Sequence, residues 1–178
     1  MSLRHAILTS LLEKPTSGLE LTRRFDRSIG YFWQASHQQV YRELGALEID
    51  GLVASIPQPP SQGNRKHFKV TPRGRDELIS WVARLEEPRP NRDPLLVRLR
   101  AASVVGLGPL PDQLEAHRAA HLELRDEYIA IGKRDFVGAL SESAGLQHLI
   151  LRAGVELEQF WADWLERAIA EIAQMRGE

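Results

Sequence analysis

The chain has 178 residues, of which 43% are hydrophobic and 26% are charged, the composition of an ordinary globular protein with a sizeable core. It contains no cysteine, which excludes a disulfide scaffold, a thiolate metal site and a cysteine nucleophile. Its apolar runs are short and interrupted by charges, and its first residues lack the pattern of a signal peptide. We therefore expect a cytoplasmic protein without a membrane span.

The net charge of −1 conceals an uneven distribution. Residues 1–84 carry 12 Lys and Arg against 8 Asp and Glu, whereas the remaining residues carry 11 against 16. The first part is therefore positive by 4 charges and the second is negative by 5. This asymmetry is typical of a basic module that faces nucleic acid, joined to an acidic module with another task.

Two helices are predicted at the start of the chain. The spacing of apolar residues predicts a helix over residues 3–13, with an inward face formed by Ile7, Leu8, Leu11 and Leu12. After Pro15, a capping box of Ser17 and Glu20 begins a second helix over residues 19–27. Leu21 and Phe25 are expected on its inward face.

A second capping box, formed by Ser36 and Gln39, begins a third helix. This helix is expected to end near Asp50, because Gly51 suits the left-handed position that follows a helix. On a helical wheel one face is apolar and is formed by Val40, Leu44 and Leu47. The opposite face carries Gln38, Arg42 and Ala46, with Gln39 beside them.

The periodicity then changes from that of a helix to that of strands. Residues 52–56 and 67–70 are predicted to pair as antiparallel strands, with Phe68 and Val70 on one face, and the proline-rich loop between them ends in Arg65 and Lys66. Thr71 and Pro72 begin a fourth helix, whose apolar stripe is formed by Leu78, Val82 and Leu85. The order of these elements predicts a winged helix-turn-helix with a small two-stranded β-wing.

The rest of the chain is predicted to be helical. A short helix over residues 95–105 ends near Gly106, and two longer helices follow. Their apolar positions alternate in steps of three and four, at 114, 117, 121, 124, 128 and 131, and again at 146, 150, 153, 157, 160, 164, 168, 172 and 175. Apolar residues at this spacing form a stripe along one side of a helix, called a seam below. Such a seam packs against another helix, often from a second chain.

We therefore expect a mainly α fold with three parts. Residues 1–86 form a winged helix-turn-helix domain, residues 87–94 form a linker, and residues 95–178 form a helical dimerisation and effector region.

The exposed end of the third predicted helix carries side chains that suit DNA. A glutamine can bind adenine, and an arginine can bind guanine, through paired hydrogen bonds in the major groove. We expect Tyr41 and the wing cations to contact the DNA backbone. A merely solvated helix face is the alternative, but the strands and basic loop that follow favour DNA. The candidate DNA-binding residues are Ser36, His37, Gln38, Gln39, Tyr41, Arg42, Arg65 and Lys66.

Other candidate residues lie on the two long helices. His117 and His121 are one turn apart, as in some zinc sites, but no third ligand is evident, so we interpret them as seam residues and expect no metal or other cofactor. Trp161 and Trp164 are candidates for stacking a planar effector, or for core packing. The sequence contains no phosphate-binding loop, dinucleotide motif or nucleophile elbow, so we do not expect an enzyme.

Residues 6–82 resemble the PadR family of bacterial transcriptional regulators, most clearly over residues 32–53 and 63–74. The residues that carry this resemblance are Phe32, Trp33, Ser36, Tyr41, Leu44, Leu47, Glu48, Gly51, Leu52 and Val53, followed by Gly63, Arg65, Lys66, Phe68, Val70, Thr71 and Gly74. The part after Arg84 resembles family members of the virulence-activator type, which have a longer helical C-terminal region. Two departures stand out: Ser17-Gly18-Leu19 replaces the common His-Gly-Tyr, and Arg42 stands where proline is common.

The resemblance implies a homodimer that binds inverted repeats in double-stranded DNA. It also implies repression, often relieved by a small aromatic or amphipathic effector. The alternative hypothesis is a winged helix that binds a protein partner and has no specific DNA-binding activity. The polar side chains of Gln38, Gln39 and Arg42 favour DNA, because a protein interface would more often carry an apolar anchor.

Overall fold

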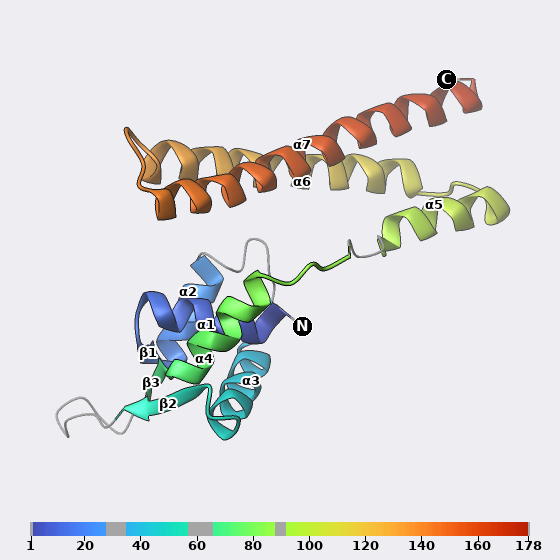
Figure 1. The fold of residues 1–178 in the computed structure, drawn as a ribbon. Helices are drawn as coiled ribbons and strands as arrows, with labels where there is room; N and C mark the ends of the chain where they lie inside the picture. The colour runs from blue at the N-terminus through green and yellow to red at the C-terminus, as the bar shows by residue number, and fades with distance from the viewer. Residues whose placement is uncertain (1, 28–34, 57–65, 88–91, 178) are drawn as a thin grey trace. The chain divides into compact units, whose positions relative to one another are not determined.

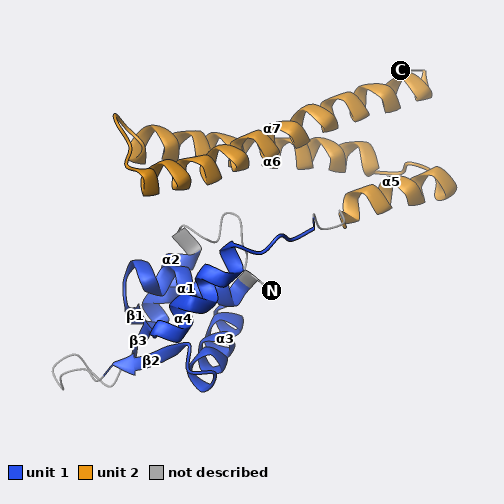
Figure 2. Ribbon diagram, viewed as in Figure 1, with its two compact units in different colours: residues 1–88 blue, residues 89–178 orange. Residues whose placement is uncertain are grey.

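The computed structural model describes residues 2–27, 35–56, 66–87 and 92–177. The chain divides into two compact units, residues 1–88 and residues 89–178, and each is described by itself below (Figure 2). Among the described residues, none of the helices combines the length and the apolarity needed to cross a membrane.

The first unit contains four helices and a small sheet among its described residues (Figure 1). In chain order its elements are α1 (Ser2–Glu13), β1 (Thr16–Ser17), α2 (Gly18–Arg27), α3 (His37–Ile49), β2 (Val53–Ile56), β3 (His67–Val70) and α4 (Pro72–Val82). The four helices and the strands β2 and β3 confirm the winged helix-turn-helix predicted from the sequence.

The wing was expected to have two strands, but the sheet has three. The strand order is β1-β3-β2, and both pairings are antiparallel. Thr16 pairs with Phe68, whereas Val53 pairs with Val70 on the other side of β3. With only two residues, β1 is too short to show the alternation by which a strand is recognised in a sequence.

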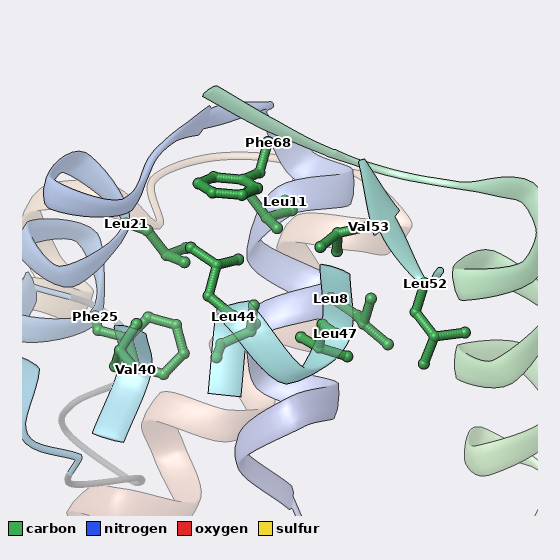
Figure 3. Close-up of a cluster of buried hydrophobic side chains, with 11 residues drawn as sticks. Leu8, Leu11, Leu21, Phe25, Val40, Leu44, Leu47, Leu52, Val53 and Phe68 are labelled. Atoms are coloured by element: carbon green, nitrogen blue, oxygen red, sulfur yellow. The ribbon is translucent and has the colours of Figure 1, made fainter. Parts of the chain in front are cut away.

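An apolar core joins helices α1, α2 and α3 to the sheet (Figure 3). Its buried side chains are Ile7, Leu8, Leu11, Leu21, Phe25, Val40, Leu44, Leu47, Leu52, Val53 and Phe68. The inward faces predicted for the first three helices are therefore confirmed, with one exception. Leu12 is 40% exposed, because it lies a quarter turn away from Leu11 on the edge of the buried face.

The beginning of α4 matches its prediction, but its end does not. The Thr71 hydroxyl accepts a hydrogen bond from the backbone N–H of Gly74, and Pro72 follows the cap. The expected apolar stripe was wrong at its last two positions: Val82, the final residue of the helix, is 73% exposed, and Leu85, which lies after the helix, is fully exposed. Within the first unit, the end of α4 therefore does not pack against the apolar core, although the spacing of its apolar residues predicted that it would.

The second unit consists of α5 (Pro94–Val105), α6 (Leu110–Asp135) and α7 (Glu142–Arg176). Helices α6 and α7 form a long hairpin and pack side by side (Figure 1). Leu95 of α5 joins a second apolar cluster with Leu110 and Leu114 of α6 and Leu165 of α7. As predicted, the short helix ends at Gly106, which has a positive φ of 90°.

The two predicted seams have different environments. All six seam residues of α6 are buried or partly buried, and Leu114 and Tyr128 are the most buried of them. On α7, however, the buried residues are Glu158, Ala162 and Leu165, which the predicted seam does not contain. Leu146, Ile150, Leu157 and Phe160 of that seam are 46–58% exposed. Helix α7 therefore has two apolar faces, about a third of a turn apart. The predicted seam is exposed at these four residues, whereas its later members Trp164 and Ile172 pack against the second apolar cluster.

We predict that Gly74→Ala destabilises the first unit by about 2 kcal/mol. A Cβ atom at this position would lie 2.1 Å from the carbonyl oxygen of Leu52. That oxygen cannot move freely, because it accepts hydrogen bonds from the backbone and the hydroxyl of Thr71. Urea-induced unfolding of both variants measures the effect.

The control for this prediction is Gly45→Ala in α3, where a new Cβ would meet no atom within 4 Å. There we expect no loss, or a gain of up to about 1 kcal/mol from the lower entropy of the unfolded chain. Equal stability of the two variants would contradict the role assigned to Gly74.

Candidate nucleic-acid interface

The capping box predicted for α3 is present and fixes the first turn of the helix. The Ser36 hydroxyl accepts a hydrogen bond from the backbone N–H of Gln39 at 3.2 Å. In return, the backbone N–H of Ser36 donates to Oε1 of the Gln39 side chain at 2.8 Å. These two bonds satisfy donors that the start of a helix would otherwise leave unpaired.

The other end of α3 is also held in place. Gly51 has a positive φ of 70°, as its position after the helix predicted. The guanidinium of Arg4 in α1 donates a hydrogen bond to Asp50 at 2.6 Å and lies 3.9 Å from the carboxylate of Glu43. These contacts connect the end of α3 to α1.

Helix α3 presents a polar face to solvent along its first two turns. Val40, Leu44 and Leu47 are buried in the core, so the remaining side chains of the helix have a defined direction. His37, Gln38, Gln39 and Arg42 are all exposed. The structure thus brings together, at one end of one helix, the candidate residues from Ser36 to Arg42.

Tyr41 lies at the edge of this face. Its side chain is 48% exposed, and one edge of its ring lies against Gly18, the first residue of α2. A tyrosine in this position can pack its ring on the protein and still offer its hydroxyl to a ligand. The importance of Gly18 could not be found in the sequence, because nothing there indicates which residue faces Tyr41.

The structure describes one of the two wing cations. Lys66 is exposed and lies immediately before β3, with its Nζ 3.5 Å from the carboxylate of Glu48 in α3. Such exposed ion pairs contribute at most about 1 kcal/mol, so the ammonium group remains able to exchange partners. Arg65 lies outside the described residues, as do Phe32 and Trp33.

Two family models match the chain, one for each unit. The model described as "Transcriptional regulator PadR-like family" matches residues 7–80, and the model "Virulence activator alpha C-term" matches residues 91–173. A probable transcriptional regulator of Mycobacterium tuberculosis is 39% identical, and the match covers 99% of this chain and 100% of the relative. The chain belongs to the PadR family of transcriptional regulators.

Solved structures of PadR-family proteins have the same fold along almost the whole chain. The Vibrio cholerae virulence activator AphA matches with a TM-score of 0.83 and 32% identity, over 98% of this chain and 99% of that protein. Bacillus subtilis PadR in complex with operator DNA matches with a TM-score of 0.81 and 25% identity, over 97% and 99% of the two chains. The same Bacillus protein is also known in complex with p-coumaric acid.

The acidic residue in the first turn of α2 remains ionised near neutral pH. The neighbouring Thr16 side chain and the positive charges of Lys14 and Arg24 hold the pKa of Glu20 below its usual value. The backbone N–H of Glu20 also donates to the Ser17 hydroxyl at 3.3 Å, which provides half of the predicted capping box. The carboxylate of Glu20 lies 4.0 Å from the ammonium group of Lys14, so its negative charge is partly balanced locally.

The remaining candidate residues lie in the second unit, on α6 and α7. The ring of Trp161 stacks on His121 at a centroid distance of 6.0 Å and meets Trp164 edge to face at 5.6 Å. Trp164 also packs against the second apolar cluster, and His121 bonds to the buried carboxylate of Glu158. These contacts give His121 and both tryptophans a packing role within the helical hairpin.

His117 is partly buried on the same face of α6 as His121. Among the described residues, no three histidine or acidic side chains gather in a way that could hold a metal ion.

We predict that the two neighbouring glutamines of α3 differ in their effect on stability. Gln39→Ala removes the side chain that accepts the Ser36 N–H bond and should lower the free energy of unfolding by about 1 kcal/mol. Gln38→Ala, which removes an equally exposed side chain from the same turn, should change it by less than about 0.5 kcal/mol. Chemical denaturation of both variants tests this difference, and equal losses would show that the capping bond contributes nothing.

Proposed function

We propose that this PadR-family regulator is a homodimeric repressor that binds an inverted-repeat operator through α3 and releases it when a small effector binds. The observation that carries the proposal is the exposed polar face at the capped end of α3, where Gln38 and Arg42 lie in adjacent turns. Bacillus subtilis PadR, which has the same fold, is known in complex with operator DNA. A helix of this kind reads base edges when its first turns enter the major groove.

The side chains of the interface divide into three roles. Gln38 and Arg42 read bases, since both are exposed. Gln38 is also not part of the capping box, which holds the side chain of Gln39. Gln39 serves mainly to fix the helix, because its oxygen already accepts the Ser36 N–H and is turned back toward the cap. Bidentate binding to adenine needs both the oxygen and the nitrogen of an amide.

The third role is contact with the DNA backbone. Tyr41 offers a hydroxyl at the edge of the helix, and Lys66 offers an ammonium group beside the wing. Arg65, Ser36 and His37 are further candidates for phosphate contacts. Such contacts fix the position of the protein on the duplex without reading its sequence.

The second apolar face of α7 supports a homodimer. Leu146, Ile150, Leu157 and Phe160 recur at steps of three, four and seven, and each is roughly half exposed in the single chain. An apolar stripe of this length on one long helix is costly in water and is typical of an interface between helices. A two-fold symmetric dimer requires an operator with two inverted half-sites.

The effector is proposed to be a small aromatic or amphipathic molecule with Trp161 and Trp164 among its contacts. The two rings lie edge to face beside His121, and p-coumaric acid, a planar aromatic acid, is bound in the structure of the Bacillus relative. That relative is described as a negative regulator, which supports repression. The effector controls DNA binding only to the extent that it binds one conformation of the dimer more tightly than the other.

We predict that Gln38→Ala and Arg42→Ala each weaken binding to the selected operator by about 1–3 kcal/mol and relax base preference at particular positions. Lys66→Ala should weaken binding to specific and random DNA alike, and should reduce its salt dependence. Selection of bound DNA from a random pool identifies the operator, and fluorescence anisotropy then measures each variant. If none of these changes affects DNA affinity, a protein-interaction module becomes the better interpretation.

We also predict that the double variant Leu157→Glu/Phe160→Glu is monomeric. It places two carboxylates in the proposed interface, where their desolvation costs several kcal/mol each. The control is Ala170→Glu, which adds a carboxylate to an exposed position of α7 outside both apolar faces. Sedimentation equilibrium should find a monomer for the double variant and a dimer for the control, while circular dichroism should find equal helix content. A dimeric double variant would contradict this interface.

A further inference from the structure

Helix α2 approaches α3 so closely at Gly18 that a larger residue there would have to displace the Tyr41 ring. Gly18 is buried, and a Cβ atom built on it would lie 2.5 Å from Cε1 of Tyr41 and 3.2 Å from Cδ1 and Cζ of the same ring. Contacts below 3.0 Å essentially do not occur for real Cβ atoms. The edge of the Tyr41 ring therefore occupies the space that any other side chain at position 18 would need.

The backbone conformation does not explain this glycine. Gly18 is absent from the glycines with a positive φ, which are Gly51, Gly106, Gly108, Gly138 and Gly177. It begins α2 directly after the cap residue Ser17, at a position where alanine would be accommodated by the backbone. The nearest atoms that a side chain at position 18 would meet thus belong to the Tyr41 ring.

The ring of Tyr41 lies against Gly18, and the residue as a whole is 48% exposed. We propose that Gly18 is a positioning residue for DNA-backbone recognition, because its missing side chain lets the Tyr41 ring rest on the first turn of α2 and directs the hydroxyl toward a phosphate. This inference rests on the proposed function, in which Tyr41 contacts the DNA backbone. Gly18 of α2 thereby joins the residues that determine the affinity for DNA, although α2 itself contacts no DNA in this proposal.

A methyl group at position 18 would move the ring by a predictable amount. To reach an ordinary contact of 3.4 Å from the present 2.5 Å, Cε1 must shift by at least 0.9 Å. The atoms that must move lie at the end of a side chain that is half exposed, so the shift costs little folding free energy. The hydrogen bond from the hydroxyl is more sensitive, because such bonds weaken steeply once distance and angle depart from their preferred values.

Gly18→Ala should therefore lower the affinity for DNA without lowering the stability of the fold. We expect its affinity for the selected operator to fall roughly tenfold, the effect of losing one hydrogen bond to a charged group. Affinity for random duplex DNA should fall by the same factor, because a phosphate contact carries no sequence information. The melting temperature should stay the same or rise, since alanine lowers the entropy of the unfolded chain.

The test is a double-mutant cycle with the full-length protein and fluorescein-labelled operator DNA. Gly18→Ala is combined with Tyr41→Phe, which keeps the ring and removes the hydroxyl, and with Tyr41→Ala, which removes both. We expect Gly18→Ala to have no further effect in either background, because the contact that it disturbs is already absent. Gly145→Ala, in the first turn of α7 where a Cβ would meet no atom within 4 Å, is the matched control and should leave affinity unchanged.

Three results would overturn the inference. The first is an unchanged affinity of Gly18→Ala while Tyr41→Phe weakens binding. The second is an equal loss from Gly18→Ala in the presence and in the absence of the Tyr41 ring, which would mean that Gly18 acts through another group. The third is a wild-type protein that binds no DNA, which would refute the proposed function and this inference together, whereas the first two leave the proposed function intact.

Discussion

Val40, Leu44 and Leu47 bury one face of α3 against α1, α2 and the sheet, and this burial fixes the rotation of the helix about its axis. The direction of every exposed side chain on α3 follows from it. A rotation by one residue would move Arg42 through about 100° and replace the polar face by a mixed one. The candidate DNA-binding surface thus depends first on apolar packing at the back of the helix, and only then on the polar residues at its front.

Two of the polar residues at the front have structural tasks of their own. Ser36 and Gln39 close the capping box, so the first turn of α3 is rigid before any DNA arrives. A ligand-binding group that is already ordered loses less entropy on binding. The ring of Tyr41 is likewise restricted before binding, because it rests on Gly18. This end of the helix is therefore held both by the capping box within α3 and by the contact of Tyr41 with Gly18 of α2.

The second unit follows a different principle, in which one helix carries two apolar faces. Helix α7 packs on α6 through Ala162 and Leu165 and, with its other apolar face, carries the residues proposed for the dimer interface. The buried His121–Glu158 pair lies on the first of these faces. Polar pairs of this kind contribute little net stability, but they can fix the register of two helices, because a shifted register leaves both groups unpaired.

The sequence by itself determined the elements whose stability is local. Helix bounds, the cap at Ser36, the end of α3 at Gly51 and the buried face of α3 all follow from interactions between residues a few positions apart, so spacing alone reveals them. The resemblance around Tyr41 and Gly51 also identified the family. Only the tertiary structure decided the pairing of β1 with β3, the use of the Gln39 oxygen by the cap, and the contact between Gly18 and Tyr41. It also decided that Val82 and Leu85 are exposed and which apolar face of α7 meets α6. The periodicity of a helix gives the direction of a side chain relative to its neighbours in the chain, but the residue that it meets is usually distant in sequence and is fixed only by the packing of the whole unit.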